Sequence, residues 1–186
     1  KNKWIEARIV YGITEAFRFY GGPIDGVNKY GEEGPEGLIN AWPLNEAYID
    51  YVEGNPEAGI INNMSIEINA ETIIAANMSE DDADVSTGWH AIEFLLWGQD
   101  FSLETAGIRE ASDYLPTNEI NVRRRAYLVA TSTLLLEHVN WLAEQWSENG
   151  EGRKSFMAKD DPGGAILTGI ATLAGFELSS ERIATA

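Results

Sequence analysis

The chain has 186 residues, of which 44% are hydrophobic, and its 30 acidic and 13 basic residues give a formal net charge of -17. This length and apolar content are those of one ordinary globular domain or two small ones. The acidic excess repels nucleic acid and anionic lipid, so we expect no nucleic-acid partner and favour cations or neutral solutes as ligands. The chain has no cysteine, which excludes disulfides and thiolate metal sites. No apolar run reaches the roughly 18 residues of a membrane span, so we expect no transmembrane segment.

The first helix is predicted over residues 1–20, and it carries two stripes of side chains at helical spacing. One stripe is apolar and consists of Ile5, Ile9, Ile13 and Phe17. The other mixes charged and aromatic side chains and consists of Trp4, Arg8, Tyr11, Glu15 and Arg18. Charged helix faces are ordinarily solvated, but the aromatic residues in this one favour partial burial against a carboxylate such as Asp25 or Glu93.

Glycines and prolines crowd residues 21–37, which predicts a loop too long to be a simple connection. Such loops are typically functional, but this one lacks the spacing of a phosphate-binding loop. A short helix is predicted over residues 44–52, with Glu46 and Asp50 as solvated carboxylates on one face. Another helix is predicted over residues 67–78, with Ile68, Ile73 and Ile74 facing inward.

An acidic run, Ser79–Asp84, comes next. It resembles a calcium-binding loop but lacks the required glycine at the sixth position and glutamate at the twelfth. We therefore predict a solvated acidic turn.

Residues 86–100 predict a helix buried nearly all round, and one of the two histidines lies on it. Ser86 or Thr87 is expected to cap its start, and Gly98 to end it in a left-handed conformation. Apolar side chains cover most of its surface, so a charged group within it must be paired or bound to a metal.

His90, Glu93 and Trp97 lie on one face of this helix, at spacings of three and four residues. One histidine and one glutamate do not complete a metal site by themselves. The residues alone therefore leave two interpretations open: a core pair that holds helices in register, and a metal or ligand site at His90 and Glu93.

The longest helix is predicted over residues 118–149. Its expected inner stripe, with its flanking residues, consists of Val122, Ala126, Leu128, Val129, Thr133, Leu135, Leu136, Asn140, Leu142, Ala143 and Trp146. Arg123, Arg124 and Arg125 crowd its first turns, where the helix dipole disfavours cations, so we expect an acidic partner unless they are simply solvated. His138 lies on the same helix and is a weaker candidate ligand than His90.

Residues 150–162 are predicted to be a mobile polar segment, and residues 163–186 a last helix whose small side chains permit close approach to a neighbour. With no alternating strand pattern, the predicted architecture is all-α, a bundle of four main helices with long irregular connections.

The motif Gly88-x-His90-x-x-Glu93, followed by Phe94-Leu95-Leu96-Trp97-Gly98-Gln99-Asp100, resembles the signature of the imelysin-like family. These are bacterial envelope proteins that are linked to iron uptake and also classed with the M75 metallopeptidases. The resemblance extends to Ala7–Tyr20, Gly22–Asp25, Trp42–Asp50 and Leu167–Arg182.

The resemblance implies an exported protein of the periplasm or outer envelope, with a leader removed before Lys1. It implies a metal ion, iron or another divalent cation, at His90 and Glu93. The surrounding site residues would be Arg8, Tyr11, Glu15, Asp25, Gly88 and Trp97. Implied partners are a metal ion or small ligand and other envelope iron-uptake components.

Three functions follow as alternatives. We favour a metal- or ligand-binding protein over a metallopeptidase, because the sequence has two histidines and no His-Glu-x-x-His motif. The third is a helical module whose His–Glu pair is only structural.

The resemblance also implies that this chain is an incomplete form of a longer, two-half architecture. A second half or another chain would then cover apolar surface near the His90 face.

Overall fold

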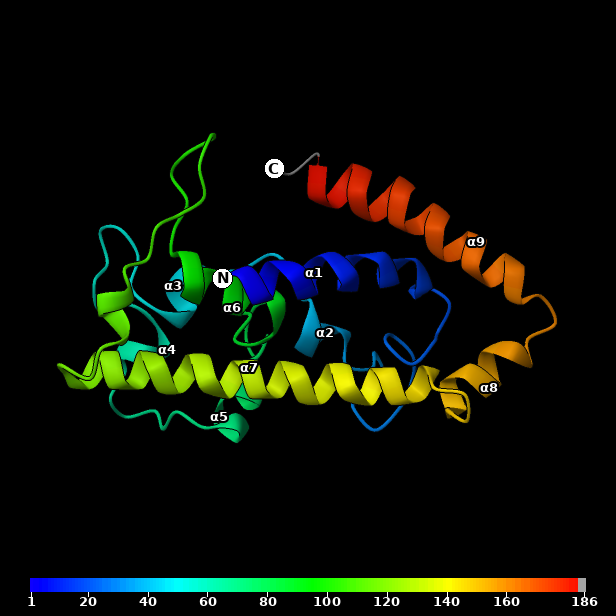
Figure 1. The fold of residues 1–186 in the computed structure, drawn as a ribbon, viewed down its shortest axis with the longest axis horizontal. Helices are drawn as coiled ribbons and strands as arrows, with labels where there is room; N and C mark the ends of the chain where they lie inside the picture. The colour runs from blue at the N-terminus through cyan, green and yellow to red at the C-terminus, as the bar shows by residue number, and fades with distance from the viewer. Residues whose placement is uncertain (184–186) are drawn as a thin grey trace. The chain divides into compact units, whose positions relative to one another are not determined.

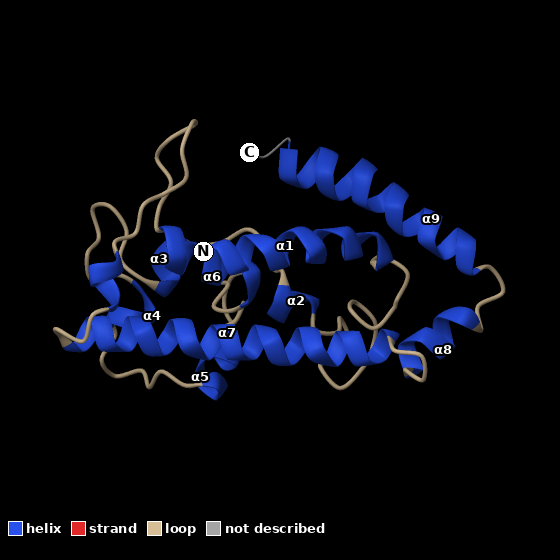
Figure 2. Cartoon of the chain, in the orientation of Figure 1, coloured by secondary structure: helices blue, strands red, loops and turns tan. Residues whose placement is uncertain are grey.

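The computed structural model describes residues 1–183, and every regular element in that range is a helix (Figure 2). The predicted all-α class is confirmed. Figure 1 labels the main helices in chain order. The elements are α1 Asn2–Thr14, η1 Glu15–Phe17, α2 Glu36–Ile39, α3 Glu46–Ile49, α4 Gly59–Asn62, α5 Ala70–Ala76, α6 Gly88–Trp97, η2 Ala111–Tyr114, α7 Glu119–Trp146, α8 Glu151–Met157, α9 Pro162–Thr172 and η3 Leu173–Ile183. The first two η segments are 3₁₀ helices, and η3 is a π-helix.

The chain divides into two compact units. The central unit is Gly37–His138, and the terminal unit combines Lys1–Glu36 with Val139–Ala186. Helix α7 therefore contributes residues to both units. No helix in the described range is long and apolar enough to cross a membrane.

The core of the central unit forms around α6. Its buried members are Ile49, Ile60, Ile61, Ile73, Ala91, Phe94, Leu95, Tyr127 and Leu134. They come from α3, α4, α5, α6 and α7, so short helices far apart in sequence meet on one apolar cluster. Each fully buried large apolar side chain stabilises the fold by about 1.5–3 kcal/mol relative to exposure.

The inner face of α7 differs from the predicted one. Val122, Val129 and Leu136 are 49%, 59% and 62% exposed. The buried residues are Arg124, Tyr127, Thr131, Leu134, Leu135, His138 and Leu142. Leu135 and Leu142, which were predicted to widen the stripe, are buried, but the main stripe was wrong because polar residues on the buried face find partners that allow their burial.

Arg123 and Arg124 show how these partners are supplied. Arg123 donates to the carbonyls of Ile60, Ile61, Asn63 and Ile66, at 2.7–3.1 Å, around the end of α4. Arg124 pairs with Asp50, so it has an acidic partner as expected, although Asp50 itself was predicted to be solvated. Neither arginine is the solvated surface charge that we considered as the alternative.

Helix α1 ends earlier than predicted and buries its polar-aromatic stripe. Tyr11, Glu15 and Arg18 are 5–9% exposed, whereas Ile9 and Ile13 are 65% and 74% exposed. Glu15 accepts a hydrogen bond from Arg8 at 3.3 Å, and Arg18 pairs with Glu36 at 2.9 Å. This pairing within the terminal unit makes burial of the charged stripe possible.

Two of the short helices are shorter than the sequence predicted. The helix predicted over residues 44–52 is α3, with four residues, and the helix predicted over residues 67–78 is α5, with seven. Ile73 is fully buried as expected, but Ile74 is 39% exposed. The acidic residues Glu80, Asp81 and Asp82 are exposed, in agreement with a solvated turn.

The segment predicted to be mobile contains a helix, α8. After it, the Asp161 side chain caps α9 by accepting from the Gly164 amide at 2.8 Å. A Cβ at Gly169 would collide with the Ala16 carbonyl, so the expected close approach is present, between α9 and η1. The prediction for residues 184–186 lies outside the described residues.

Candidate functional site

Helix α6 begins at Gly88 and ends at Trp97, as the sequence predicted. Gly98 has φ +71° at its C-terminal end. The predicted side-chain cap is absent: Thr87 occupies the capping position without making the hydrogen bond. The Ser86 hydroxyl instead donates to the Ile73 carbonyl at 2.6 Å, which ties the start of α6 to α5.

Gly88 of the family motif has a backbone function. Its φ is +88°, and a Cβ there would lie 2.5 Å from the Ile39 carbonyl oxygen. Only glycine tolerates both the left-handed conformation and this close approach. Gly88 therefore allows the start of α6 to pack against the end of α2.

The motif's histidine and glutamate form a pair on α6. His90 Nδ1 lies 3.3 Å from Glu93 Oε2, and the ring of Trp42 lies 4.9 Å from the imidazole. The side chains of His90 and Glu93 are 17% and 46% exposed. The helix is therefore not buried all round, and its accessible edge carries an acid and a base in contact.

The predicted surrounding residues fall into two groups. Arg8, Tyr11, Glu15 and Asp25 belong to the terminal unit, whereas Gly88 and Trp97 lie with His90 on α6 in the central unit. That the two groups form one site stays a prediction.

Of the four predicted site residues in the terminal unit, three are linked by contacts of Arg8. Arg8 contacts both Glu15, at 3.3 Å, and the ring of Tyr11, at 5.3 Å. Burial, reinforced by Glu36 and Glu15, raises the pKa of the Tyr11 phenol, so it stays protonated at neutral pH. Asp25 serves its own loop and accepts from the amides of Phe19 and Gly22.

The donors on the described residues do not fit a complete resident metal site. No group of three or more histidine, aspartate or glutamate side chains there is close enough to hold an ion. His90 and Glu93 supply two donors, whereas catalytic zinc sites use three protein ligands and structural sites four. His138, 2% exposed on α7, adds no third.

The central unit contains a second charged cluster, and the sequence predicted an acidic partner for its arginines without identifying Asp50 as that partner. Asp50 is fully buried rather than solvated, and its carboxylate pairs with the guanidinium groups of Arg109 and Arg124. Arg124 Nε lies 2.6 Å from Asp50 Oδ2, and the two guanidinium carbons lie 4.7 and 5.1 Å from the Tyr51 ring centre. The signal in the sequence was the run of arginines in the first turns of α7, where the helix dipole disfavours cations.

This cluster affects the titration of its members. Burial lowers the pKa of Arg124, but hydrogen bonding and attraction to Asp50 more than reverse that effect, so the net pKa is raised. Burial and the hydrogen bond to Asp113 raise the pKa of Tyr51. These groups hold one protonation state at neutral pH, which favours a structural function for the cluster.

The motif's Gln99 is also structural. Its amide nitrogen donates to Glu46 at 3.0 Å, and its oxygen accepts from the Glu53 amide at 2.5 Å. Burial raises the pKa of Glu46, and the hydrogen bond from Gln99 opposes that shift. Gln99 thus holds the end of α6 against α3 and the turn that follows it.

The protein is all-α, and His90 and Glu93 are in contact on a partly accessible edge of α6. The family model described as Imelysin, peptidase family M75, matches residues 1–186, so the chain belongs to the imelysin family. Comparison with curated proteins and with solved structures gives no match.

Proposed function

We propose that this imelysin-family chain is a binding protein of the bacterial cell envelope, associated with iron uptake. Its ligand is a metal ion or small solute, held at the His90–Glu93 edge of α6. The observation that carries this proposal is the contact of 3.3 Å between an imidazole and a carboxylate that both remain partly accessible.

The donor count favours binding over peptide hydrolysis. A metallopeptidase needs about three protein ligands, an open position for water and a general base. His90 and Glu93 would provide two ligating groups, and among the described residues no third histidine, aspartate or glutamate joins them in a group that could hold a metal ion. The metallopeptidase assignment is therefore the weaker alternative.

Two donors suit a metal that arrives as cargo. Imidazole and carboxylate both bind iron and similar divalent cations, and a small chelating molecule or water completes the coordination of an ion held by two protein ligands. In this case iron enters and leaves the site together with the chelating molecule or water that completes its coordination. The acidic excess of the chain also favours cations over anions near its surface.

The export and the partners are parts of the same proposal. We place the protein in the periplasm or outer envelope, in contact with other iron-uptake components, on the strength of its family. Fractionation of the native host with an antibody to this chain tests that location, and a cytoplasmic signal alone would contradict it.

Calorimetric titration of the untagged protein with ferrous and manganous ions tests the site. We expect His90→Ala and Glu93→Gln each to weaken binding about tenfold or more, as loss of one of two ligands requires. Acidification should weaken it too, because an imidazolium has no lone pair for the metal. Glu6→Gln is the matched control, since Glu6 forms an exposed pair with Lys3 at the same i,i+3 spacing.

The outcomes separate the three functions. Unchanged affinity in both variants would remove the pair from the site. Loss of stability without any effect on binding would support the structural module. Peptide cleavage that disappears with both His90→Ala and a chelator would establish the peptidase; loss with the chelator alone would indicate a contaminating enzyme.

A further inference from the structure

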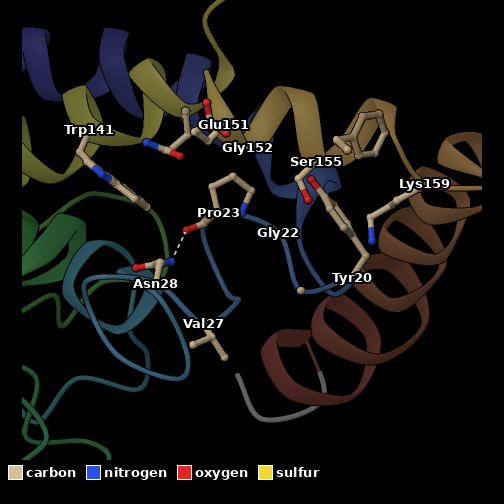
Figure 3. Close-up of a pocket in the computed structure, with 13 residues that line it drawn as sticks. Tyr20, Gly22, Pro23, Val27, Asn28, Trp141, Glu151, Gly152, Ser155 and Lys159 are labelled. Atoms are coloured by element: carbon tan, nitrogen blue, oxygen red, sulfur yellow. Dashed lines mark hydrogen bonds between the residues drawn. The ribbon is translucent and has the colours of Figure 1, made fainter. Parts of the chain in front are cut away.

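The terminal unit contains a cavity of about 190 Å³ that belongs to neither charged cluster described above. Figure 3 shows it between the loop that follows α1, the C-terminal half of α7 and helix α8. Its lining includes Tyr20, Pro23, Val27, Trp141, Phe156 and Lys159.

One polar atom in its lining is buried without a partner. The Tyr20 hydroxyl is covered and forms no hydrogen bond within the described residues. Burial, with a smaller contribution from Asp25, raises the pKa of this phenol, so it carries its proton at neutral pH and acts as a donor. A buried donor of this kind is costly, and an acceptor atom on a ligand would remove the cost.

A cation lies at the edge of the same cavity. Lys159 Nζ is 5.5 Å from the centre of the Tyr20 ring, and the residue is exposed. The one carboxylate in the lining, Glu151, is paired with Lys154 at 2.7 Å. The acceptor that fits Tyr20 and Lys159 together is therefore negatively charged.

Flat apolar groups form the other walls. Phe156 is 8% exposed, with its ring centre 5.6 Å from those of both Tyr20 and Trp146. Trp141 and Pro23 also line the space. An apolar cavity of about 150 Å³ holds benzene, so this one accommodates a single ring with a small substituent.

The loop that forms one side is fixed before any ligand binds. Asp25 accepts from the Gly22 amide at 3.1 Å, and Asn28 donates to the Pro23 carbonyl at 2.9 Å (Figure 3). Gly152 packs so closely that a Cβ would collide with Pro23. A prearranged wall reduces the entropy that binding would otherwise cost.

We infer that this cavity is a second ligand site, which binds a small monocyclic carboxylate. The carboxylate accepts a hydrogen bond from the Tyr20 hydroxyl and is attracted by Lys159. The ring occupies the apolar space beside Trp141 and Phe156. The site is independent of the His90–Glu93 pair.

Benzoate is the probe, and its binding to the full chain is measured by ligand-observed NMR and calorimetry. We expect a dissociation constant of about 1 mM, as for a ligand of this size in a partly open site. Tyr20→Phe, which removes only the hydroxyl, should weaken binding about tenfold. Lys159→Gln should weaken it about threefold and reduce its salt dependence.

Control variants and a neutral ligand distinguish binding in this cavity from non-specific binding. Lys3→Gln removes another exposed ammonium, outside the cavity lining, and should leave affinity unchanged, as should His90→Ala. Benzamide, with the same ring but no charge, should bind less tightly than benzoate. Failure of benzoate to bind, equal affinity for benzamide, or unchanged affinity in both Tyr20→Phe and Lys159→Gln would overturn the inference. Because Lys159 is exposed, Lys159→Gln remains informative even if Tyr20→Phe fails to fold.

Discussion

The buried carboxylate of Asp50 stabilises two buried arginines. It is fully buried and is the common partner of Arg109 and Arg124, with a further hydrogen bond from Asn62 at 3.3 Å. Both guanidinium groups are almost completely removed from water. The desolvation of these cations is offset only while the carboxylate is present.

We therefore expect Asp50→Asn to lower the free energy of unfolding by about 3–5 kcal/mol, because it leaves two buried cations without their counter-charge. Denaturant titration followed by circular dichroism measures the change. Asp82→Asn, in the exposed acidic turn, is the control and should have almost no effect. A loss as small as that of the control would show that the arginines are stabilised by other groups.

The partly buried phenol of Tyr114 makes the stability of the fold depend on pH in the alkaline range. Its hydroxyl donates to the Leu95 carbonyl, and burial raises its pKa from 10.0 to about 12. The unfolded chain loses this proton near pH 10, whereas the folded chain keeps it to a higher pH. The stability contribution is therefore complete below pH 10 and is lost as the pH rises through about 12.

Tyr114→Phe should flatten this alkaline loss of stability. Removing one such proton reduces the slope by at most about 1.4 kcal/mol per pH unit. Unfolding free energies of both proteins between pH 9 and 12 measure the difference over the range of this pKa. Parallel curves would mean that the Tyr114 proton is not linked to folding.

At the scale of elements, the sequence predicted which segments are helical better than which faces they bury. The bounds of α6 followed from Ser86 and Thr87 as candidate capping residues, from Gly98 and from an apolar run, which are local signals. The buried face of α7 depends on Asp50 and on the carbonyls of α4, which are far from it in sequence. A pattern of apolar residues cannot reveal that Arg124 finds such partners.

Partners that are distant in sequence also determine which residues are buried on α1 and at the candidate site. The aromatic residues of the polar stripe correctly predicted its burial, but the acidic partner of Arg18 is Glu36 rather than the expected Asp25 or Glu93. The spacing of His90 and Glu93 correctly placed the two residues in contact, because i,i+3 geometry is local. Their partial exposure depends on packing that spacing alone does not determine.

Gly88→Ala tests the contact between α6 and α2. We expect it to destabilise the protein by about 3 kcal/mol or more, since strain at positive φ adds to a collision with the Ile39 carbonyl. Gly54→Ala is matched: its φ is +78°, but its Cβ would meet no atom within 4 Å. It should cost only about 1 kcal/mol, from backbone strain. Equal thermal shifts in the two variants would exclude a contribution from close packing.

At the scale of the whole molecule, the imelysin family model matches the entire chain. Membership of a peptidase family does not by itself show that this chain hydrolyses peptides. The matched residues include Gly88, Gln99 and Asp50, and each of these has a structural function here. His90 and Glu93 are the motif residues whose side chains meet at an accessible edge. That the chain is part of a longer two-half protein stays a prediction.

The connection between α6 and η2 carries several strongly exposed apolar residues. Figure 1 shows it extending away from α6, and Phe101, Leu103 and Ile108 on it are 72–107% exposed. An exposed apolar loop of this kind is a preferred site for chymotrypsin. We expect the first cut there, before any cut within α7.

That cut would turn one chain into a two-fragment complex. Asp50 would remain on the N-terminal fragment, whereas Arg109 and Arg124 would be on the other, with the Tyr127 hydroxyl still donating to the Ser86 carbonyl at 2.7 Å. The fragments should therefore co-elute in size-exclusion chromatography and separate only in denaturant. If they separate in buffer, the covalent link and not the buried cluster holds the unit together. If they stay paired, non-covalent contacts alone hold the two segments together, and Asp50→Asn should make the cut protein separate in buffer.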